Sequence, residues 1–564
     1  NLEVLKLLQK SYFEKVKMIY IDPPYNTGKD FVYKDNFNDN LKNYLEVTGQ
    51  VGEEGEKLST NSDQSGRYHS NWLNMMYPRL KLARNLLKDD GVIFISIDDN
   101  EVTNLKKICD EIFGENNIIN NRLFVNHIPN GTNKGYIARA HEYILAYSKS
   151  IDKLKTFKRW GEPIVSEERC TNTPTDKNPT STIKFKKGLR FEGTNKEING
   201  IIGNKEPIEI IGQMKFKNGY LDEDVELKSS WRNKSQILEY LKDGVAYDEN
   251  GQEVFEIYFT IDGKPKYRKK LTSYSPKSVQ QFKNYEFEKD FLDLSFENPK
   301  PVSLIEFLIK LICNNDDMVL DFFSGSGTTG NAIIKINSEY NSFIRYILVQ
   351  LPEDLDKSKN NIDGKAATFI KNMINKLDNL NKPHILTEIG KVRLDRAGEK
   401  IKQDFLRNNE NLKLGQEQKE FKTDIGFKVF KLDSSNIKAW DSEYAKDNIQ
   451  QSLLDSISNI KEDRTEHDLL FELLLKQGLD LTTPIAETKV NAKVIYNIGA
   501  GALYVSLSDN ITVDVAEKII EENKIYKSPR ITVIFKDNGF KNDVDKTNVI
   551  QTLKVAGISD IKSI

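Results

Sequence analysis

Two parts of the chain alternate short apolar runs with patterns typical of amphipathic helices. Near the start, the apolar runs "VKMIYID" and "VIFISIDD" are separated by "NWLNMMYPRLKLARNLLKDDG", which has helical spacing and ends at a glycine. The same rhythm returns around "MVLDFFSGSGTTGNAIIKI" and "FIRYILVQLPE". Strands that are connected through helices form a parallel sheet with helices on both faces. We therefore predict an α/β fold with a mostly parallel, Rossmann-like sheet.

This pattern is interrupted between residues 151 and 285. There the apolar runs are short, turn residues are frequent, and Lys, Arg and aromatic residues are interleaved, as in "IKFKKGLRF". We interpret 151–285 as a module inserted into a sheet whose two halves are 1–150 and 286–390. The remainder, 391–564, is predicted to be an α+β C-terminal domain, because a helix near "DLLFELLLKQG" is followed by a strand–helix–strand pattern.

Composition excludes some classes of protein but does not choose a function. The 564 residues carry a formal net charge of −2, which neither indicates nor excludes nucleic acid, because a basic cleft can lie on a neutral protein. No apolar run approaches the roughly 18 residues that span a bilayer. Cys109, Cys170 and Cys313 lack metal-type spacing, which favours a reducing compartment, so we expect a cytoplasmic protein. The chain starts without Met, which predicts a missing upstream segment.

The first candidate site is "DPPYNTG", which directly follows the apolar run "MIYI". Ligands of parallel sheets lie beyond the carboxyl ends of the strands, and Asp22 stands at such an end. Pro23 and Pro24 lack N–H groups, so their segment can only accept hydrogen bonds. Such a loop suits an exocyclic amine on a flat ring. The Asp22 carboxylate and the Pro23 carbonyl would accept its two hydrogens, and Tyr25 would stack on the ring. The alternative is a stiff surface turn.

The second candidate site is "DFFSGSGTTG", where a strand enters a glycine turn and leaves as a helix. Gly325, Gly327 and Gly330 satisfy G-x-G-x-x-G, which is typical of a ligand on helix N-terminal amides but also compatible with a simple tight turn. No G-x-x-x-x-G-K-[ST] occurs, so nothing indicates a P-loop ATPase. In the next strand end, "VQLPE", Gln350 or Glu353 could bond ribose hydroxyls; Glu353 is equally compatible with a solvated helix start.

These two motifs carry a family resemblance. "DPPYNTG" followed much later by "DFFSGSGTT" resembles an amino-group DNA methyltransferase that uses S-adenosylmethionine, in the motif order of the beta class. "HEYILAYSK", "FENPKPVSLIEFLI", "RYILVQLPE" and "GFKVFKLDSSNIKAWD" further resemble the modification (Mod) subunit of type III restriction–modification systems, over most of the chain. In this family Asp-Pro-Pro-Tyr implies adenine N6 as the target, whereas N4-cytosine enzymes more often begin with Ser. The resemblance implies that 151–285 recognises double-stranded DNA.

The resemblance also implies a role for each site residue. Asp22 and the Pro23 carbonyl would hold N6. Pro24 would shape the loop, and Tyr25 would stack on a base that is flipped out of the duplex. Direct transfer to N6 needs no metal. The residues implied to hold S-adenosylmethionine are Asp321, Phe322, Ser324, Gly325 and Gly327, with Lys300 and Pro301 near its methionine end and Gln350 or Glu353 near its ribose.

The inserted module contains the basic run "KPKYRKK". Its place in the module favours contacts with DNA phosphates, which orient a protein but do not read sequence. A solvated face is the alternative. The candidate phosphate-binding residues are Lys264, Lys266, Arg268, Lys269 and Lys270. Elsewhere, "HEYIL" begins like a zinc-protease helix, but residue 145 is Leu, so we predict a strand and no metal role for His141 and Glu142.

By resemblance, the C-terminal region would bind the restriction (Res) subunit and a second Mod protomer. The sequence itself shows only apolar faces, such as "LLFELLLKQGLDL", that are equally compatible with internal core. The alternatives to a Mod subunit are a beta-class methyltransferase that acts alone on adenine N6 or cytosine N4, and a DNA-recognition subunit without methylation activity. A nicotinamide-dependent oxidoreductase is the weakest alternative, because Asp-Pro-Pro-Tyr has no role in hydride transfer.

Overall fold

The computed structural model describes a chain of two compact units. Its described residues are 1–26, 68–125, 142–154, 165–247, 253–270, 300–360, 365–410, 420–438 and 460–564. The first unit comprises Asn1–Val16, Asn74–Lys88 and Phe427–Ile564, and the second comprises Lys17–Leu73 and Asp89–Gly426. Within the described residues, no helix is long and apolar enough to cross a membrane.

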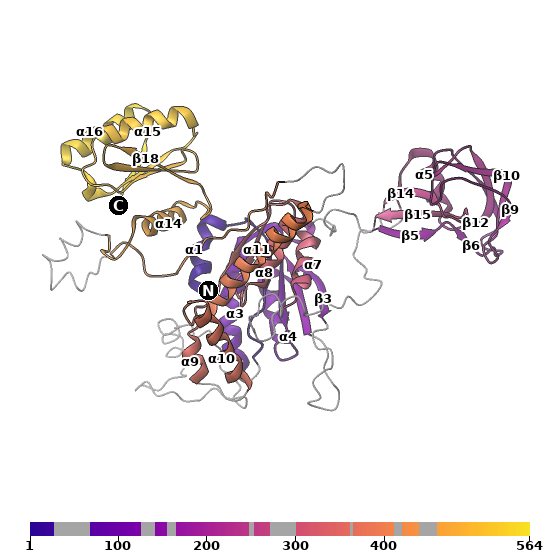
Figure 1. The fold of residues 1–564 in the computed structure, drawn as a ribbon, viewed down its shortest axis with the longest axis horizontal. Helices are drawn as coiled ribbons and strands as arrows, with labels where there is room; N and C mark the ends of the chain where they lie inside the picture. The colour runs from indigo at the N-terminus through magenta and orange to yellow at the C-terminus, as the bar shows by residue number, and fades with distance from the viewer. Residues whose placement is uncertain are drawn as a thin grey trace. The chain divides into compact units, whose positions relative to one another are not determined.

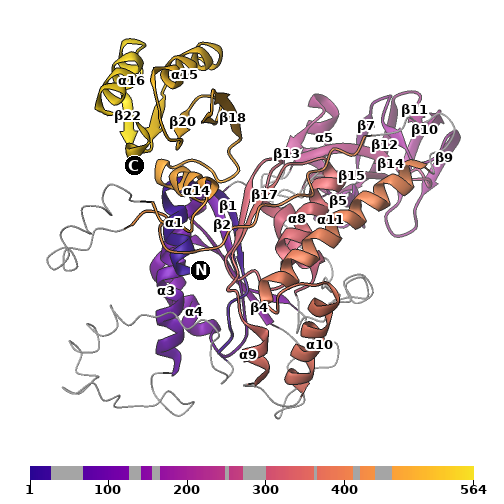
Figure 2. The same ribbon diagram turned by 60° about the vertical axis from the view of Figure 1, so that its left-hand side comes forward.

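The second unit contains a six-stranded sheet with the strand order β17-β16-β1-β2-β4-β3. Figure 2 shows β1, β2, β4 and β17 of this sheet. β1 is parallel to β16, and β16 is parallel to β17. β4 is antiparallel to both β2 and β3. The strands are β1 (Val16–Ile21), β2 (Leu87–Ile97), β3 (Ile118–Val125), β4 (Glu142–Ser148), β16 (Met318–Asp321) and β17 (Arg345–Leu348).

Helices pack on both faces of this sheet, which confirms the predicted α/β fold. On one face Tyr20, Phe94 and Ile144 share a buried core with α7 (Val302–Ile312) and α8 (Thr328–Tyr340). On the other face the Tyr147 hydroxyl of β4 donates to Asp110 of α4 at 2.7 Å. The other described helices of 1–154 and 300–410 are α1 (Leu2–Tyr12), α3 (Tyr68–Leu86), α4 (Val102–Phe113), η1 (Glu115–Asn117), η2 (Ile151–Lys153), α9 (Leu355–Asn360), α10 (Lys365–Asn379) and α11 (Leu386–Glu410).

The strand predicted from "HEYILAYSK" is present as β4, but it departs from the parallel pattern. It runs antiparallel between β2 and β3. Antiparallel neighbours need no helical crossover, so β3 and β4 can pair without a helix between them. The parallel strands β1, β16 and β17 are therefore the part of the sheet that matches the Rossmann-like prediction.

Residues 165–247 and 253–270 form a β-rich body with an eleven-stranded sheet (Figure 1). Its core is aromatic: the rings of Phe191 and Phe216 stack at 4.0 Å, and Phe259 lies against Phe216. The elements are β5 (Val165–Arg169), β6 (Thr171–Asn172), β7 (Ser181–Phe185), β8 (Arg190–Phe191), β9 (Lys196–Ile202), β10 (Ile208–Lys217), β11 (Tyr220–Leu221), β12 (Val225–Trp231), α5 (Lys234–Asp243), β13 (Ala246–Tyr247), β14 (Glu253–Phe259) and β15 (Pro265–Lys270).

The C-terminal region of the first unit is a five-stranded sheet with the order β18-β19-β20-β21-β22. Leu469, Leu473 and Leu474 of α14 are buried in a core shared with this sheet, so the apolar face of "LLFELLLKQGLDL" is internal. The expected strand–helix–strand pattern is present as β20, α15 and β21. The elements are α14 (Glu466–Gln477), β18 (Ile485–Val490), β19 (Lys493–Ile498), β20 (Leu503–Ser506), α15 (Val513–Tyr526), β21 (Thr532–Phe535), η3 (Asp537–Gly539), α16 (Asp543–Val555) and β22 (Asp560–Ser563).

Helix α8 packs closely against α11 and β17 at Gly330. A Cβ atom there would lie 2.6 Å from Cδ2 of Leu394 on α11 and 3.0 Å from Cδ1 of Leu348 on β17. We expect Gly330→Val to lower the free energy of unfolding by about 1–3 kcal/mol, because a branched side chain overpacks this contact. Thermal unfolding followed by circular dichroism measures the effect. Glu339→Val, an exposed change on the same helix, is the control; equal melting temperatures for both variants would contradict the packing argument.

Candidate functional site

The two candidate loops follow neighbouring parallel strands. β1 ends at Ile21, one residue before Asp22, and β16 ends at Asp321. The two strands pair in register, with Met18 opposite Val319. The carboxyl ends of neighbouring parallel strands lie at the same edge of a sheet, so the structure brings the proline loop and the glycine turn together.

Residues of two other elements fix the proline loop. Trp72 of α3, which is fully buried, donates its Nε1–H to the Pro24 carbonyl at 2.6 Å. Asn26 has a positive φ of 57°, and its side-chain amide donates to the buried carboxylate of Glu101. His69 Nδ1 lies 2.6 Å from the same Glu101 carboxylate. Sequence reasoning assigned no role to Trp72, Glu101 or His69, because their links to the loop join residues far apart in the chain.

Asp22, Tyr25, Glu142 and Lys300 form one cluster of charged and polar groups. The Lys300 ammonium is 2.5 Å from Glu142 Oε2, 2.6 Å from the Tyr25 hydroxyl and 3.5 Å from Asp22 Oδ1. The Tyr25 hydroxyl is 2.9 Å from Asp22 Oδ1 and 3.1 Å from Glu142 Oε2. Lys300 is only 8% exposed, compared with 30% for Asp22 and 21% for Glu142. The structure therefore places Lys300 beside the proline loop, and adds Glu142 to the site.

Burial and charge act in opposite directions on this cluster. Burial raises the pKa of Asp22, the Lys300 ammonium lowers it, and Glu142 raises it again, so that the net shift is upward. Burial lowers the pKa of Lys300, but Asp22 and Glu142 outweigh it and leave the pKa raised. Burial also raises the pKa of Tyr25, as do both carboxylates. Lys300 is therefore a cation and Tyr25 a neutral phenol at neutral pH.

Backbone geometry and side chains from two further elements shape the glycine turn. Gly325 and Gly327 have φ values of 51° and 80°, in the left-handed region that favours glycine. Gly327 is the residue before the first turn of α8. The Gly325 N–H donates to Gln350 Oε1 at 2.7 Å. Arg393 of α11 is buried and donates to the Ser326 and Thr328 hydroxyls at 2.6 and 2.9 Å.

Asp321 is buried at the start of this turn. It accepts hydrogen bonds from the Thr329 hydroxyl at 2.6 Å and from the Phe323 N–H at 3.1 Å. Burial raises the pKa of Asp321 to about 7, and the charge of Asp22 adds to the increase. The electrostatic influence of Asp22 on Asp321 agrees with the closeness of the two loops.

The other predicted cofactor residues lie around the same turn. Phe322 is fully buried, and Ser324 is 9% exposed with its N–H bonded to the Val349 carbonyl. Pro301 precedes the first turn of α7. Glu353 accepts from the Ser358 hydroxyl at 2.5 Å, so its carboxylate is engaged at the start of α9. Gln350 thus contacts the glycine turn directly, whereas the carboxylate of Glu353 bonds Ser358.

The basic run of the inserted module divides into two groups. Arg268 lies 3.0 Å from Glu256 and 3.5 Å from Glu167, and Lys269 lies 2.8 Å from Glu168. The structure describes no side chain for Lys270. Among the described residues, Lys264 and Lys266 have no carboxylate within ion-pair distance.

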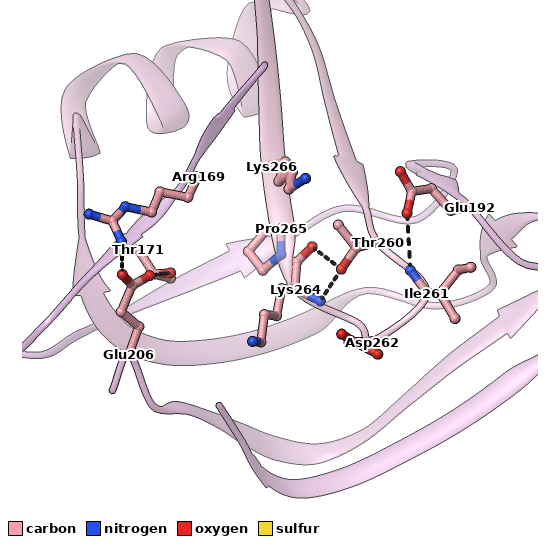
Figure 3. Close-up of a pocket in the computed structure, with 10 residues that line it drawn as sticks. All are labelled: Arg169, Thr171, Glu192, Glu206, Thr260, Ile261, Asp262, Lys264, Pro265 and Lys266. Atoms are coloured by element: carbon pink, nitrogen blue, oxygen red, sulfur yellow. Dashed lines mark hydrogen bonds and ion pairs between the residues drawn. The ribbon is translucent and has the colours of Figure 1, made fainter. Parts of the chain in front are cut away.

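Lys264 and Lys266 line a pocket of about 460 Å³ (Figure 3). On one side of it, Arg169 and Thr171 bond the carboxylate of Glu206. On the other side, the turn from Thr260 to Lys264 is closed by hydrogen bonds between these two residues. The unpaired lysines of the run therefore lie together at this turn and at the first residues of β15.

Within the described part of the chain, no group of three or more His, Cys, Asp or Glu side chains could hold a metal ion. His141 lies outside the described residues. Glu142 is the first residue of β4 and is engaged by Lys300, as described above.

Comparison with known proteins identifies relatives of this chain. Residues 16–353 match the family model described as "DNA methylase", for N6 and N4 methyltransferases. The EcoPI Mod subunit of Escherichia phage P1 is 33% identical over 376 residues, 64% of this chain and 58% of the relative. The StyLTI Mod subunit of Salmonella typhimurium is 33% identical over 411 residues, 70% of this chain and 56% of the relative. Both relatives belong to type III restriction–modification enzymes.

The chain is also similar to methyltransferases outside the type III systems. The type II methyltransferase M.KpnI of Klebsiella pneumoniae is 29% identical over 381 residues, 64% of this chain and 80% of the relative. The solved PvuII cytosine-N4-specific DNA methyltransferase aligns over 67% of this chain and 90% of its own length, at 13% identity and a TM-score of 0.26. The chain spans a little more than half the length of the Mod relatives, and by the match over residues 16–353 it belongs to the DNA methylase family of N6 and N4 methyltransferases.

Proposed function

We propose that the protein is a site-specific DNA methyltransferase that transfers a methyl group from S-adenosylmethionine to adenine N6 in double-stranded DNA. We further propose that it is the modification and recognition subunit of a type III restriction–modification system. One observation carries the chemistry: an acceptor-only loop with Asp22 and Tyr25 shares a sheet edge with a glycine turn. The likeness to Mod subunits supports the system.

The proline loop would bind the target amine through two acceptors. Trp72 occupies the Pro24 carbonyl, which leaves the Pro23 carbonyl and the Asp22 carboxylate as the acceptor pair. Accepting both amine hydrogens localises the nitrogen lone pair and directs it away from the ring. Tyr25 would stack on the base, which must be flipped out of the duplex at a cost of a few kcal/mol.

The residues of the glycine turn fit S-adenosylmethionine. Ser324, Gly325, Ser326 and Gly327 place only small side chains between the end of β16 and the N-terminus of α8. The carboxyl groups of Asp22 and Asp321 lie at the same edge, where an ionised carboxylate suits a sulfonium cation. When bound, the cofactor would supply an activated methyl group. The protein's part is then to align the amine with that group, which is the main source of rate in such a transfer.

The domains would divide this work. Residues 1–150 and 286–390 would form the methyltransferase domain, 151–285 would recognise DNA, and 391–564 would bind partners. By analogy with the Mod relatives, the partners would be a Res subunit and a second Mod protomer. A cytoplasmic location follows from a DNA substrate and is compatible with the free, buried cysteines. The likeness to M.KpnI supports one alternative, a methyltransferase without Res.

Asp22 tests the reaction. We expect Asp22→Ala to reduce the rate of DNA methylation at least about 100-fold, because one acceptor for the amine is lost, while affinity for DNA persists. Methyl incorporation into DNA and fluorescence anisotropy measure the two effects. Asp152→Ala, at an exposed aspartate, is the control. Near-normal methylation by Asp22→Ala would refute the mechanism.

The product base and the bound partner separate the alternatives. We expect mass spectrometry of nucleosides from methylated DNA to show N6-methyladenine, because the loop begins with Asp; N4-methylcytosine would overturn the assignment of the target. Co-purification with a helicase-like Res chain is expected for a type III system. If no Res chain co-purifies from a host that encodes a Res chain, the result would favour an enzyme that acts alone.

The cofactor is tested by equilibrium binding. We expect calorimetry to detect S-adenosylmethionine binding and no binding of NAD. Gln350→Ala should weaken S-adenosylmethionine binding, because the Gly325 N–H loses its partner and the turn loses a fixed conformation. Binding of NAD in preference to S-adenosylmethionine would indicate an oxidoreductase instead.

The paired and unpaired lysines test the DNA contacts. We expect the double variant Lys264→Ala/Lys266→Ala to reduce the slope of log affinity against log salt by up to about 2, since each lost phosphate contact removes about 0.9. Lys269→Ala is the matched control, because Glu168 already neutralises that lysine. Binding isotherms on duplex DNA between low and moderate salt give both slopes. An unchanged slope in the double variant would exclude this turn from the DNA interface.

A further inference from the structure

Glu142 has no task in the methyl transfer outlined above, yet its carboxylate lies within the catalytic cluster. It is the first residue of β4, and β4 pairs with β2, which lies beside β1 in the sheet. Its Oε2 atom is 2.5 Å from the Lys300 ammonium and 3.1 Å from the Tyr25 hydroxyl. The same ammonium is 1 Å farther from Asp22, at 3.5 Å.

We propose that Glu142 is a positioning residue that holds the Lys300 ammonium and so leaves the Asp22 carboxylate available to the target amine. The inference rests on the proposed methyltransferase function. In this arrangement the Lys300 ammonium can pair with either of two carboxylates, and its shorter contact is with Glu142. Asp22 therefore keeps an oxygen that can accept a hydrogen from the incoming base.

The burial of Lys300 makes this competition unavoidable. The side chain is only 8% exposed, so its charge needs a partner inside the protein. Among the described residues, Asp22 and Glu142 are the carboxylates within ion-pair distance. Without Glu142, Asp22 would be the one described carboxylate left within ion-pair distance, so the ammonium would pair with Asp22 and compete with the target amine for that carboxylate.

Tyr25 is positioned by the same carboxylate. Its hydroxyl accepts from Lys300 at 2.6 Å and can donate to either Asp22 or Glu142. A hydroxyl has a single hydrogen, and Asp22 is its nearer acceptor, at 2.9 Å compared with 3.1 Å for Glu142. Glu142 therefore offers Tyr25 a second acceptor when the target amine binds Asp22. The ring that would stack on the base is thereby fixed at its far end.

The electrostatics of the cluster predict a distinctive dependence on pH. The ionisable groups that face Asp22 are Tyr20, Tyr25, Glu142, Lys300 and Asp321. Burial and Glu142 raise the pKa of Asp22, against Lys300. Asp22 must be ionised to accept a hydrogen bond from the target amine and, after methyl transfer, to take up the proton that the amine releases. Activity is therefore lost as pH falls through the pKa of Asp22. Removing the charge of Glu142 lowers the pKa and moves the acid limb to lower pH. Burial, with a smaller contribution from Glu142, also raises the pKa of Asp98.

The test compares single-turnover methylation by the full-length protein, its Glu142→Gln variant and a matched control, Glu115→Gln, across pH. For Glu142→Gln we expect the plateau rate to fall about tenfold or more, with the half-saturating DNA and S-adenosylmethionine concentrations changed less than about threefold. We also expect the acid limb to move to lower pH. Glu115→Gln, at an exposed position on η1, should match the wild type.

Each other outcome decides against the inference. A wild-type plateau rate for Glu142→Gln would show that Lys300 does not compete for Asp22. A reduced rate with an unmoved acid limb would indicate a structural role only. Should Glu142→Gln fail to fold, Glu142→Asp retains the charge on a shorter side chain. It is expected to keep the wild-type acid limb at a reduced rate, and a displaced limb would contradict the proposal. Inactivity of the wild type itself would reject the proposed function rather than this role of Glu142.

Discussion

The parallel pairing of β1 with β16 is the constraint on which the site depends. Each strand is short and buried, and each ends where a polar loop begins. Their parallel register places Asp22 and Asp321 at one edge of the sheet although 299 positions separate them in the chain, the difference between the two residue numbers. An antiparallel pairing would have put the two loops at opposite edges. The chemistry thus follows from strand direction before any side chain is considered.

At that edge of the sheet, the buried ammonium of Lys300 contacts several polar partners at once. Lys300 is enclosed with two carboxylates and a phenol, and besides burial the charge of Glu142 acts on the pKa of Asp22, Tyr25 and Lys300, raising each of them. Leaving one buried charge without a partner is costly, so removal of any member redistributes the remaining contacts. The proline loop is also held by Trp72, which donates to the Pro24 carbonyl, and by its own Asn26, which donates to the Glu101 carboxylate.

The inserted module shows why a basic run is a weak guide to a DNA surface. Its strand β15 lies between β5 and β14, whose glutamates neutralise Arg268 and Lys269. These pairs contribute to the sheet instead of extending a positive surface. Among the described residues of the run, Lys264, exposed in the turn before β15, and Lys266, half-buried near the start of β15, have no carboxylate partner. Whether a basic run in a sequence forms a positive surface therefore depends on which residues of the neighbouring strands lie opposite it.

The sequence by itself determined the features that depend on local physics. Apolar runs gave the strands, prolines gave the acceptor-only loop, and glycines gave a turn with positive φ at Gly325 and Gly327. The antiparallel direction of β4 and the roles of Glu142, Trp72 and Arg393 were decided only by the tertiary structure. The contact between Tyr25 and Lys300 spans 275 positions, and no local pattern encodes such a distance. A carboxylate at the start of a strand becomes part of a site only when the sheet brings it beside a buried cation.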